Sequence, residues 1–131
     1  MTKAFKTTEI HIETTNQPGT LLKMTSPITE AGVNLNACCA YGTGNEAHFM
    51  FVTNDNEKAT GALTKAGYKP TTTEVVVIET TNETGALNTA AAKLATAGIN
   101  INYCYATTGN EGTTWIVFAT EDPNKTLKTI S

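Results

Sequence analysis

The sequence contains no arginine: all nine of its basic residues are lysine, set against twelve acidic residues for a formal net charge of −3. Without a guanidinium group, the chain has no fork-shaped donor for bidentate binding of a carboxylate, a phosphate or a guanine edge. Binding to nucleic acids depends on clustered cations, so this charge argues against a nucleic-acid partner. Any anion that the protein binds must be held by lysine or by main-chain N–H groups.

Long apolar runs are also missing, so no segment is suited to crossing a bilayer, and the first residues lack the apolar stretch of a signal peptide. We therefore expect a globular cytoplasmic protein with no membrane partner. The three cysteines, Cys38, Cys39 and Cys104, lack CxxC spacing and predict neither a disulfide framework nor a zinc site. We interpret them as small apolar residues on strands.

Catalytic machinery is absent from the sequence pattern. The acidic residues are scattered, and His11 and His48 lie far apart with no suggestive cysteine or carboxylate constellation. We interpret both histidines as surface or half-buried strand residues. The sequence thus predicts a protein that is not an enzyme, with no catalytic residues, no metal site and no cofactor.

What the sequence does contain is a repeat. The stretch from Glu13 to Leu21 returns from Glu79 to Leu87, an offset of 66 residues (79 − 13), and the block from Ala31 recurs from Ala97 at the same offset (97 − 31). Units of about 65 residues bury too little surface to be very stable alone. The two copies should therefore support each other.

Hydrophobic periodicity predicts the same order of elements in each copy. A half-buried strand at 9–14 precedes a helix from Thr20 to about Ala31, which Pro27 should kink. The next expected segments are a strand at 33–41, a strand at 47–53, a capping box from Asn54 to Glu57 and a helix at 55–66. Copy two repeats this order with a helix at 84–97, strands at 99–107 and 114–119 joined by a turn at 109–111, and a final helix opened by Asp122-Pro123.

A fourth strand is needed to complete each split βαβ unit. Residues 68–73 are the candidate in copy one, and they run directly into the strand at 75–78, with Pro70 implying an edge position. Copy two ends without a fourth strand of its own. We expect domains at 1–73 and 74–131, with residues 2–7 serving as the missing strand of copy two, so that each copy lends a strand to the other.

With these features, the chain resembles a tandem pair of ACT domains, which are small amino-acid-sensing modules, over nearly its whole length. The family loop Asp-Arg-Pro-Gly-x-Leu corresponds to Asn16–Leu21 and, with Thr84 in place of proline, to Asn82–Leu87. The resemblance implies an α+β fold of two ferredoxin-like βαββαβ units, antiparallel sheets packed against helices, and sheets paired through the second strands.

The resemblance also implies a ligand, a free amino acid, held between the first loop of one unit and the second strand of the other. The expected binding residues are Asn16, Gln17, Pro18, Gly19, Thr20, Leu21, Asn34, Asn36, Asn82, Glu83, Gly85, Ala86, Leu87, Asn100 and Asn102. Free N–H groups at a helix N-terminus can hold a carboxylate without arginine, and asparagine carbonyls can accept from an ammonium group. On these grounds we favour the first loop, which keeps Pro18.

Several alternatives stay open at this point. Asn16 and Asn82 could simply cap helices, and the protein could be a structural or protein-interaction module without a ligand. RNA binding, in which Phe49 and Phe51 would stack on bases, is disfavoured by the acidity and the missing arginine, and core packing is preferred. A homodimer and an enzyme regulated in trans are both compatible with the sequence. Pairing of the second strands would bring Cys38 near Cys104.

Overall fold

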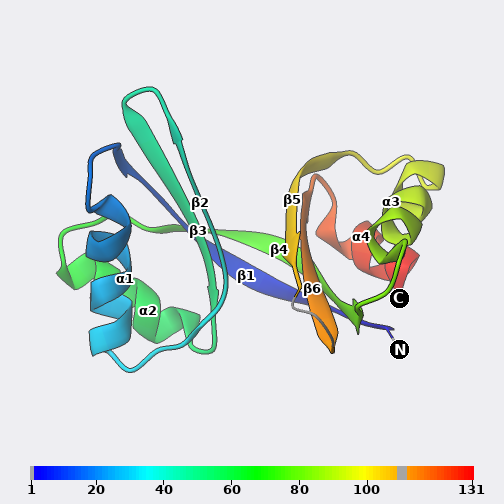
Figure 1. The fold of residues 1–131 in the computed structure, drawn as a ribbon, viewed down its shortest axis with the longest axis horizontal. Helices are drawn as coiled ribbons and strands as arrows, with labels where there is room; N and C mark the ends of the chain where they lie inside the picture. Colours follow the sequence, from blue (N-terminus) through cyan, green and yellow to red (C-terminus); the bar gives the residue numbers. More distant parts are fainter. Residues whose placement is uncertain (1, 109–111) are drawn as a thin grey trace. The chain divides into compact units, whose positions relative to one another are not determined.

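The computed structural model describes residues 2–108 and 112–131, which form strands and helices in the order expected of two repeats (Figure 1). The strands are β1 (Thr2–Thr15), β2 (Leu35–Thr43), β3 (Glu46–Thr53), β4 (Thr71–Thr81), β5 (Ile101–Thr107) and β6 (Thr113–Thr120). The helices are α1 (Thr20–Glu30), α2 (Asn56–Lys65), α3 (Ala86–Thr96) and α4 (Pro123–Ile130). None of these helices has the length and apolar character needed to cross a membrane.

Contacts divide the chain into two compact units. The first unit is Thr8–Thr73, and the second unit is Met1–Thr7 together with Glu74–Ser131. In each unit two helices cover one face of an antiparallel sheet, α1 and α2 in the first and α3 and α4 in the second (Figure 1). The α+β fold with two ferredoxin-like repeats is therefore confirmed.

In the first unit the strand order is β2-β3-β1, and both pairings are antiparallel. Ile10 lies opposite Phe51 and Ile12 opposite Phe49, so side chains of alternate residues reach the helix-covered face together. There they pack with Met24 from α1 in one buried cluster. The two phenylalanines fill this core and are not available for base stacking, as core packing predicts.

The second unit repeats this arrangement with the order β4-β6-β5. Ile78 lies opposite Ile116, and Val76 lies opposite Phe118. Together with Leu94 of α3, these residues form a second buried cluster, equivalent to the first.

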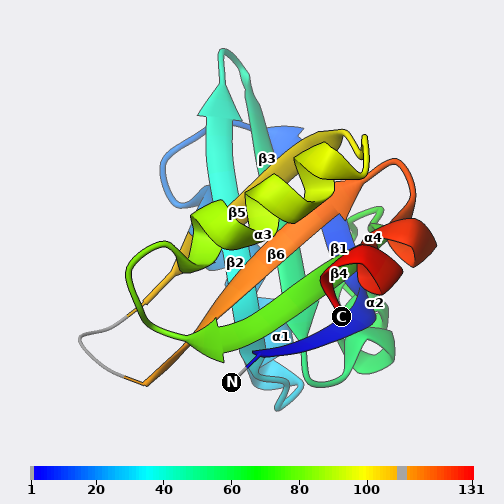
Figure 2. The same ribbon diagram turned by 90° about the vertical axis from the view of Figure 1, so that its right-hand side faces the viewer.

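The N-terminal end of β1 completes the second unit. β1 is the neighbour of β4 in the sheet, and the start of β1 runs alongside β4 in Figure 2. Ala4 packs against the second core, and the ring of Phe5 meets that of Trp115 edge-on at 5.5 Å between centroids. The ammonium group of Lys6 lies 3.1 Å from a carboxylate oxygen of Glu74. The expected use of residues 2–7 as the missing strand of copy two is confirmed.

β4 also serves both units. It is one continuous strand from Thr71 to Thr81, as the absence of a break after residue 73 predicts, and residues 71–73 belong to the first unit. Pro70 lies just before the strand and not within it, so no strand hydrogen bond is lost to its missing N–H group.

One local prediction, the capping box, is wrong. The capping box at Asn54 and Glu57 does not form, because Asp55 is the N-cap of α2 and accepts from the N–H group of Lys58 at 3.1 Å. The Asn54 carboxamide oxygen instead accepts from the N–H group of Asn34 at 3.0 Å, which ties β2 to the end of β3. Cys38 and Cys104 lie on strands as expected, on β2 and β5, and both are exposed to solvent.

Two further predictions concern helix α1 and the second hairpin. α1 continues through Pro27 as one helix and ends with Ala31 as its C-cap. The expected turn at 109–111 lies outside the described residues.

Candidate functional site

The loop between β1 and α1 is anchored to the hairpin that joins β2 and β3. The N–H group of Asn16 donates to the carbonyl of Asn45 at 2.8 Å, and the carboxamide nitrogen of Asn16 donates to the carbonyl of Gly44 at 3.2 Å. Asn16 therefore fixes the loop and does not cap the helix. The alternative that Asn16 serves as a helix cap is wrong.

Gly19 opens helix α1. It is the N-cap with φ of 86°, a left-handed conformation that favours glycine, and no side chain caps this helix. The Thr20 hydroxyl donates to the carbonyl of Gln17 at 2.6 Å, which closes the loop on itself. Pro18 lies within this closed turn.

The loop between β4 and α3 has the same conformation at its glycine but lacks the side-chain hydrogen bond that closes the first loop. Gly85 is the N-cap with φ of 86° and again no side chain caps the helix, so Asn82 is not a cap either. The N–H group of Ala86 reaches the carbonyl of Glu83 at 3.3 Å, and Ala86 has no hydroxyl to match that of Thr20. The N–H group of Asn82 donates to the carbonyl of Gly112 at 3.0 Å.

Both helix N-termini present main-chain donors. Within the described part of the chain, the N–H groups of Leu21 and Leu22 in α1, and of Leu87 and Asn88 in α3, have no hydrogen-bond acceptor. Uncapped N–H groups at a helix N-terminus, together with the helix dipole, attract an anion. The expectation that a carboxylate is held here without arginine stays a prediction.

A cavity lies beside each loop, in equivalent positions. The first, of about 270 Å³, is enclosed by the loop residues Asn16, Gln17, Gly19, Thr20 and Leu21 and by the facing parts of β2 and β3. The second, of about 650 Å³, is enclosed by Asn82, Glu83, Gly85, Ala86 and Leu87 and by α3, β5 and β6. The structure thus brings ten of the predicted site residues together, five in each unit.

The four remaining asparagines lie elsewhere in their own units. Asn34 donates to the Asn36 side chain at 3.1 Å, and Asn100 donates to the Asn102 side chain at 3.3 Å. These pairs lie at the beginnings of β2 and β5, whereas each cavity lies against the end of the same strand. Their expected role opposite the loop of the other copy stays a prediction.

The family model for the ACT domain pair matches residues 5–131, which is nearly the whole chain. The chain belongs to the ACT domain pair family. No curated protein matches this sequence. The match extends over both loops and both cavities, so each unit can be treated as one ACT unit.

Solved structures share the fold of this ACT pair. Protein BT0572 from Bacteroides thetaiotaomicron is 24% identical and has a TM-score of 0.88, covering 97% of this chain and 88% of that one. The ligand-free regulatory subunit of aspartate kinase from Thermus thermophilus is 15% identical with a TM-score of 0.69, covering 97% and 93% of the two chains. The regulatory subunit from Thermus flavus is 16% identical with a TM-score of 0.61, covering 97% and 94%. At these identities the likeness shows the fold.

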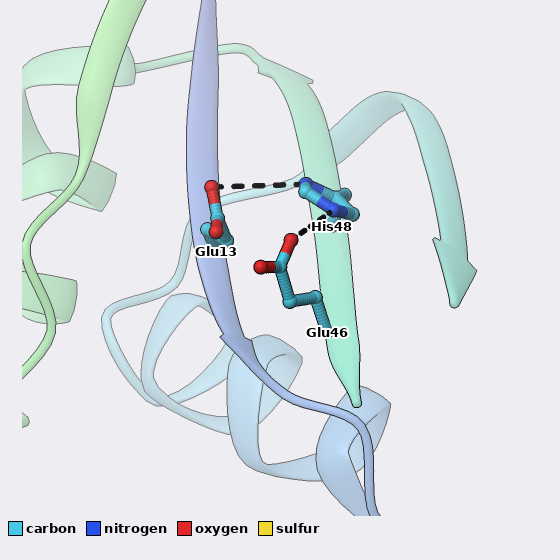
Figure 3. A group of neighbouring side chains, drawn as sticks. All are labelled: Glu13, Glu46 and His48. Carbon is cyan, nitrogen blue, oxygen red and sulfur yellow. Dashed lines mark ion pairs between the residues drawn. The ribbon is translucent and has the colours of Figure 1, made fainter. Parts of the chain in front are cut away.

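One side-chain cluster in the first ACT unit was missed by the sequence analysis. Figure 3 shows His48 between Glu13 and Glu46, with Nε2 3.3 Å from Glu46 and Nδ1 4.0 Å from Glu13. The ring of Tyr41 stacks on His48 at 4.9 Å between centroids. Both histidines are half-buried strand residues, as expected, but the carboxylates beside His48 were not visible in the sequence pattern.

This cluster is the one group of described residues with donor atoms close enough to hold a metal ion. Both carboxylates are exposed, and each lies close to a different ring nitrogen of His48, so the three side chains already have partners in one another. Its signal in the sequence is the Glu46-x-His48 spacing, which places both side chains on one face of a strand. The contribution of Glu13 comes from cross-strand register, which the sequence does not reveal.

The cysteines of the first ACT unit are poorly suited to nucleophilic chemistry. Partial burial of the thiol, and then the neighbouring Cys39, raise the pKa of Cys38. Burial, and then the charge of Glu9, raise the pKa of Cys39. Because the thiolate is the reactive form, both residues are less reactive at neutral pH than an ordinary cysteine.

Replacing Gly42 by alanine should show how tightly Asn16 is held. A Cβ atom at Gly42 would lie 2.5 Å from the carboxamide nitrogen of Asn16, so Asn16 must leave its position beside Gly44. We expect Gly42→Ala to lower the free energy of unfolding by about 1–2 kcal/mol, measured by urea denaturation.

Gly61→Ala is the matched control. Gly61 lies inside α2, and an added Cβ atom would meet no other atom. This change should raise the free energy of unfolding by about 0.5–1 kcal/mol through helix propensity alone. Equal effects of the two substitutions would show that Asn16 is not fixed against Gly42.

Proposed function

We propose that this protein is a regulatory sensor that binds a free amino acid at the loop preceding a helix and acts on an enzyme in trans. The observation that carries the proposal is the repeated, uncapped helix N-terminus beside a cavity. There two main-chain N–H groups without acceptors can receive a carboxylate, in a chain that has no arginine for that role. Membership of the ACT domain pair family supports a regulatory and not a catalytic role.

Polar groups for the other end of the ligand lie on the same loops. Glu83 and the side chains of Asn82 and Gln17 carry oxygen atoms that can accept from an ammonium group. A small zwitterion would therefore match both ends of the site. The absence of clustered cations among the nine basic residues leaves a polyphosphate or nucleic acid a poor match.

Thermal denaturation in the presence of each of the twenty amino acids tests this proposal. A ligand at 100 times its dissociation constant stabilises the native state by about 2.7 kcal/mol. For a chain of this length that should raise the melting temperature on the order of 10 °C. The D-enantiomer of any amino acid that binds is the control, because it cannot place its carboxylate, ammonium group and side chain in the same three positions.

If none of the twenty amino acids raises the melting temperature at millimolar concentration, the sensor proposal fails. A protein-interaction module then becomes the better explanation. Exposed leucines favour that second candidate: Leu22 is 69% exposed, Leu21 51% and Leu87 45%, all at the helix starts. Such side chains are typical of a surface that contacts another protein.

A further inference from the structure

The two cavities beside the loops differ in size for identifiable reasons. At equivalent positions the first unit carries Thr20, Thr25 and Phe49, whereas the second unit carries the smaller residues Ala86, Ala91 and Ile116. The second cavity accordingly extends along α3 and reaches about 650 Å³, against about 270 Å³ for the first. Small-molecule sites typically occupy about 300–1,000 Å³, so only the second cavity falls within that range.

The lining of the second cavity is mainly apolar. Ala91 of α3, Ala106 of β5 and Ile116 of β6 form a continuous wall, and Leu87 borders it at the start of the helix. Burial of apolar side-chain surface against such a wall is favourable by the hydrophobic effect. An aliphatic side chain matches this wall, whereas a polar side chain would lose water without gaining hydrogen bonds from it.

Glu83 is the one charged residue among the described residues that line the second cavity. The equivalent residue of the first unit is the neutral Gln17. A carboxylate can accept from the ammonium group of an amino acid in a charge-assisted hydrogen bond. The same carboxylate would repel an acidic side chain, and the described lining residues offer no second carboxylate to receive a basic one.

Building on the proposed function, we infer that the second ACT unit alone binds the ligand, and that the ligand is an L-amino acid with a neutral aliphatic side chain. The N–H groups of Leu87 and Asn88 receive its carboxylate, and Glu83 accepts from its ammonium group. The side chain lies over Ala91, Ala106 and Ile116. The first unit keeps the same backbone, but Thr20 and Phe49 line a smaller cavity there.

Isothermal titration calorimetry with leucine, isoleucine, valine and methionine, and with aspartate, lysine and serine for comparison, tests this inference. We expect the aliphatic amino acids to bind with one site per chain. Ala91→Leu places a larger side chain where the side chain of the ligand would lie, and should weaken binding at least 100-fold. Ala92→Leu is the matched control, because Ala92 is exposed on the same helix and does not line the cavity.

Glu83→Gln provides an independent test that leaves the shape of the site unchanged. This substitution, at an exposed loop position, gives the second unit the carboxamide group that Gln17 carries in the first unit. It should weaken binding about 10-fold, because the charge-assisted hydrogen bond to the ammonium group is lost. Glu30→Gln, the same chemical change at the exposed end of α1 and away from both cavities, should leave affinity unaltered. Circular dichroism melts of all four variants establish that each is folded.

The outcomes separate the inference from the proposed function. Tighter binding of a polar or charged amino acid, two sites per chain, or full affinity in Ala91→Leu and Glu83→Gln would overturn the inference and leave the sensor function standing. Absence of binding by all twenty amino acids would overturn both.

Discussion

Removal of residues 2–7 should lower the free energy of unfolding by about 3 kcal/mol or more, measured by denaturant titration. These residues form the part of β1 that belongs to the second unit, beside β4. Their loss removes several ladder hydrogen bonds, each worth about 1 kcal/mol net. It also uncovers Trp115, which Phe5 contacts edge-on, and leaves an open strand edge on β4.

Point substitutions in the same segment give the controls. Lys6→Gln removes the ion pair with Glu74 but keeps the strand, so the loss should stay below about 1 kcal/mol, since the pair is partly exposed. Phe5→Ala should fall between this variant and the deletion. If the truncated protein is as stable as the full chain, residues 2–7 do not complete the second unit.

Phe51→Ala should lower the free energy of unfolding by about 3–5 kcal/mol and should do so for both units at once. Phe51 is fully buried in the core of the first unit, so its removal leaves a large void. β1 and β4 each run through both units. Unfolding of the first unit therefore releases the strand that carries residues 2–7 and removes the edge of the second.

The chain contains its own probe for this coupling. Trp115 is the sole tryptophan and belongs to the second unit, so its fluorescence reports on that unit, whereas far-ultraviolet circular dichroism reports on both. In Phe51→Ala the midpoints of both transitions should shift together to a lower denaturant concentration. Leu22→Ala, at an exposed position of α1, should change stability by less than about 0.5 kcal/mol. An unshifted fluorescence transition in Phe51→Ala would show that the units unfold independently.

The architecture could be predicted from the sequence because each element occurs in both copies of the repeat. An ambiguous segment in one copy can therefore be compared with its equivalent in the other. Pro27 alone argues against a helix, but its equivalent Lys93 does not, and α1 and α3 both form. The exchange of strands could be predicted as well, because copy two ends after α4 with no fourth strand of its own while residues 2–7 precede copy one.

Features that depend on a single hydrogen bond or on cross-strand register could not be predicted. Asn54 and Asp55 are both good N-caps, and which one caps α2 was decided by the partnership of Asn54 with Asn34 across the sheet. Glu13 meets His48 through strand pairing, since the two residues are 35 positions apart (48 − 13).

The relative size of the two cavities could not be predicted from the sequence either. It is the reason why we infer that the ligand binds at the second loop and not at the first. Pro18 favoured the first loop in the sequence, because it keeps the family motif. Room for a ligand is decided instead by side chains from α3 and β6, namely Ala91 and Ile116, which no loop motif includes.

The division of strands between units has a consequence for synthesis on the ribosome. The first unit has all its residues once the chain has emerged as far as Thr73, and domains generally fold in the order of their synthesis. Residues 2–7 are made before the rest of both units, yet their partner β4 and the core they cover emerge only afterwards. Residues 2–7 are therefore made before the strand that they pair with, and the second unit is complete only when α4 has left the exit tunnel.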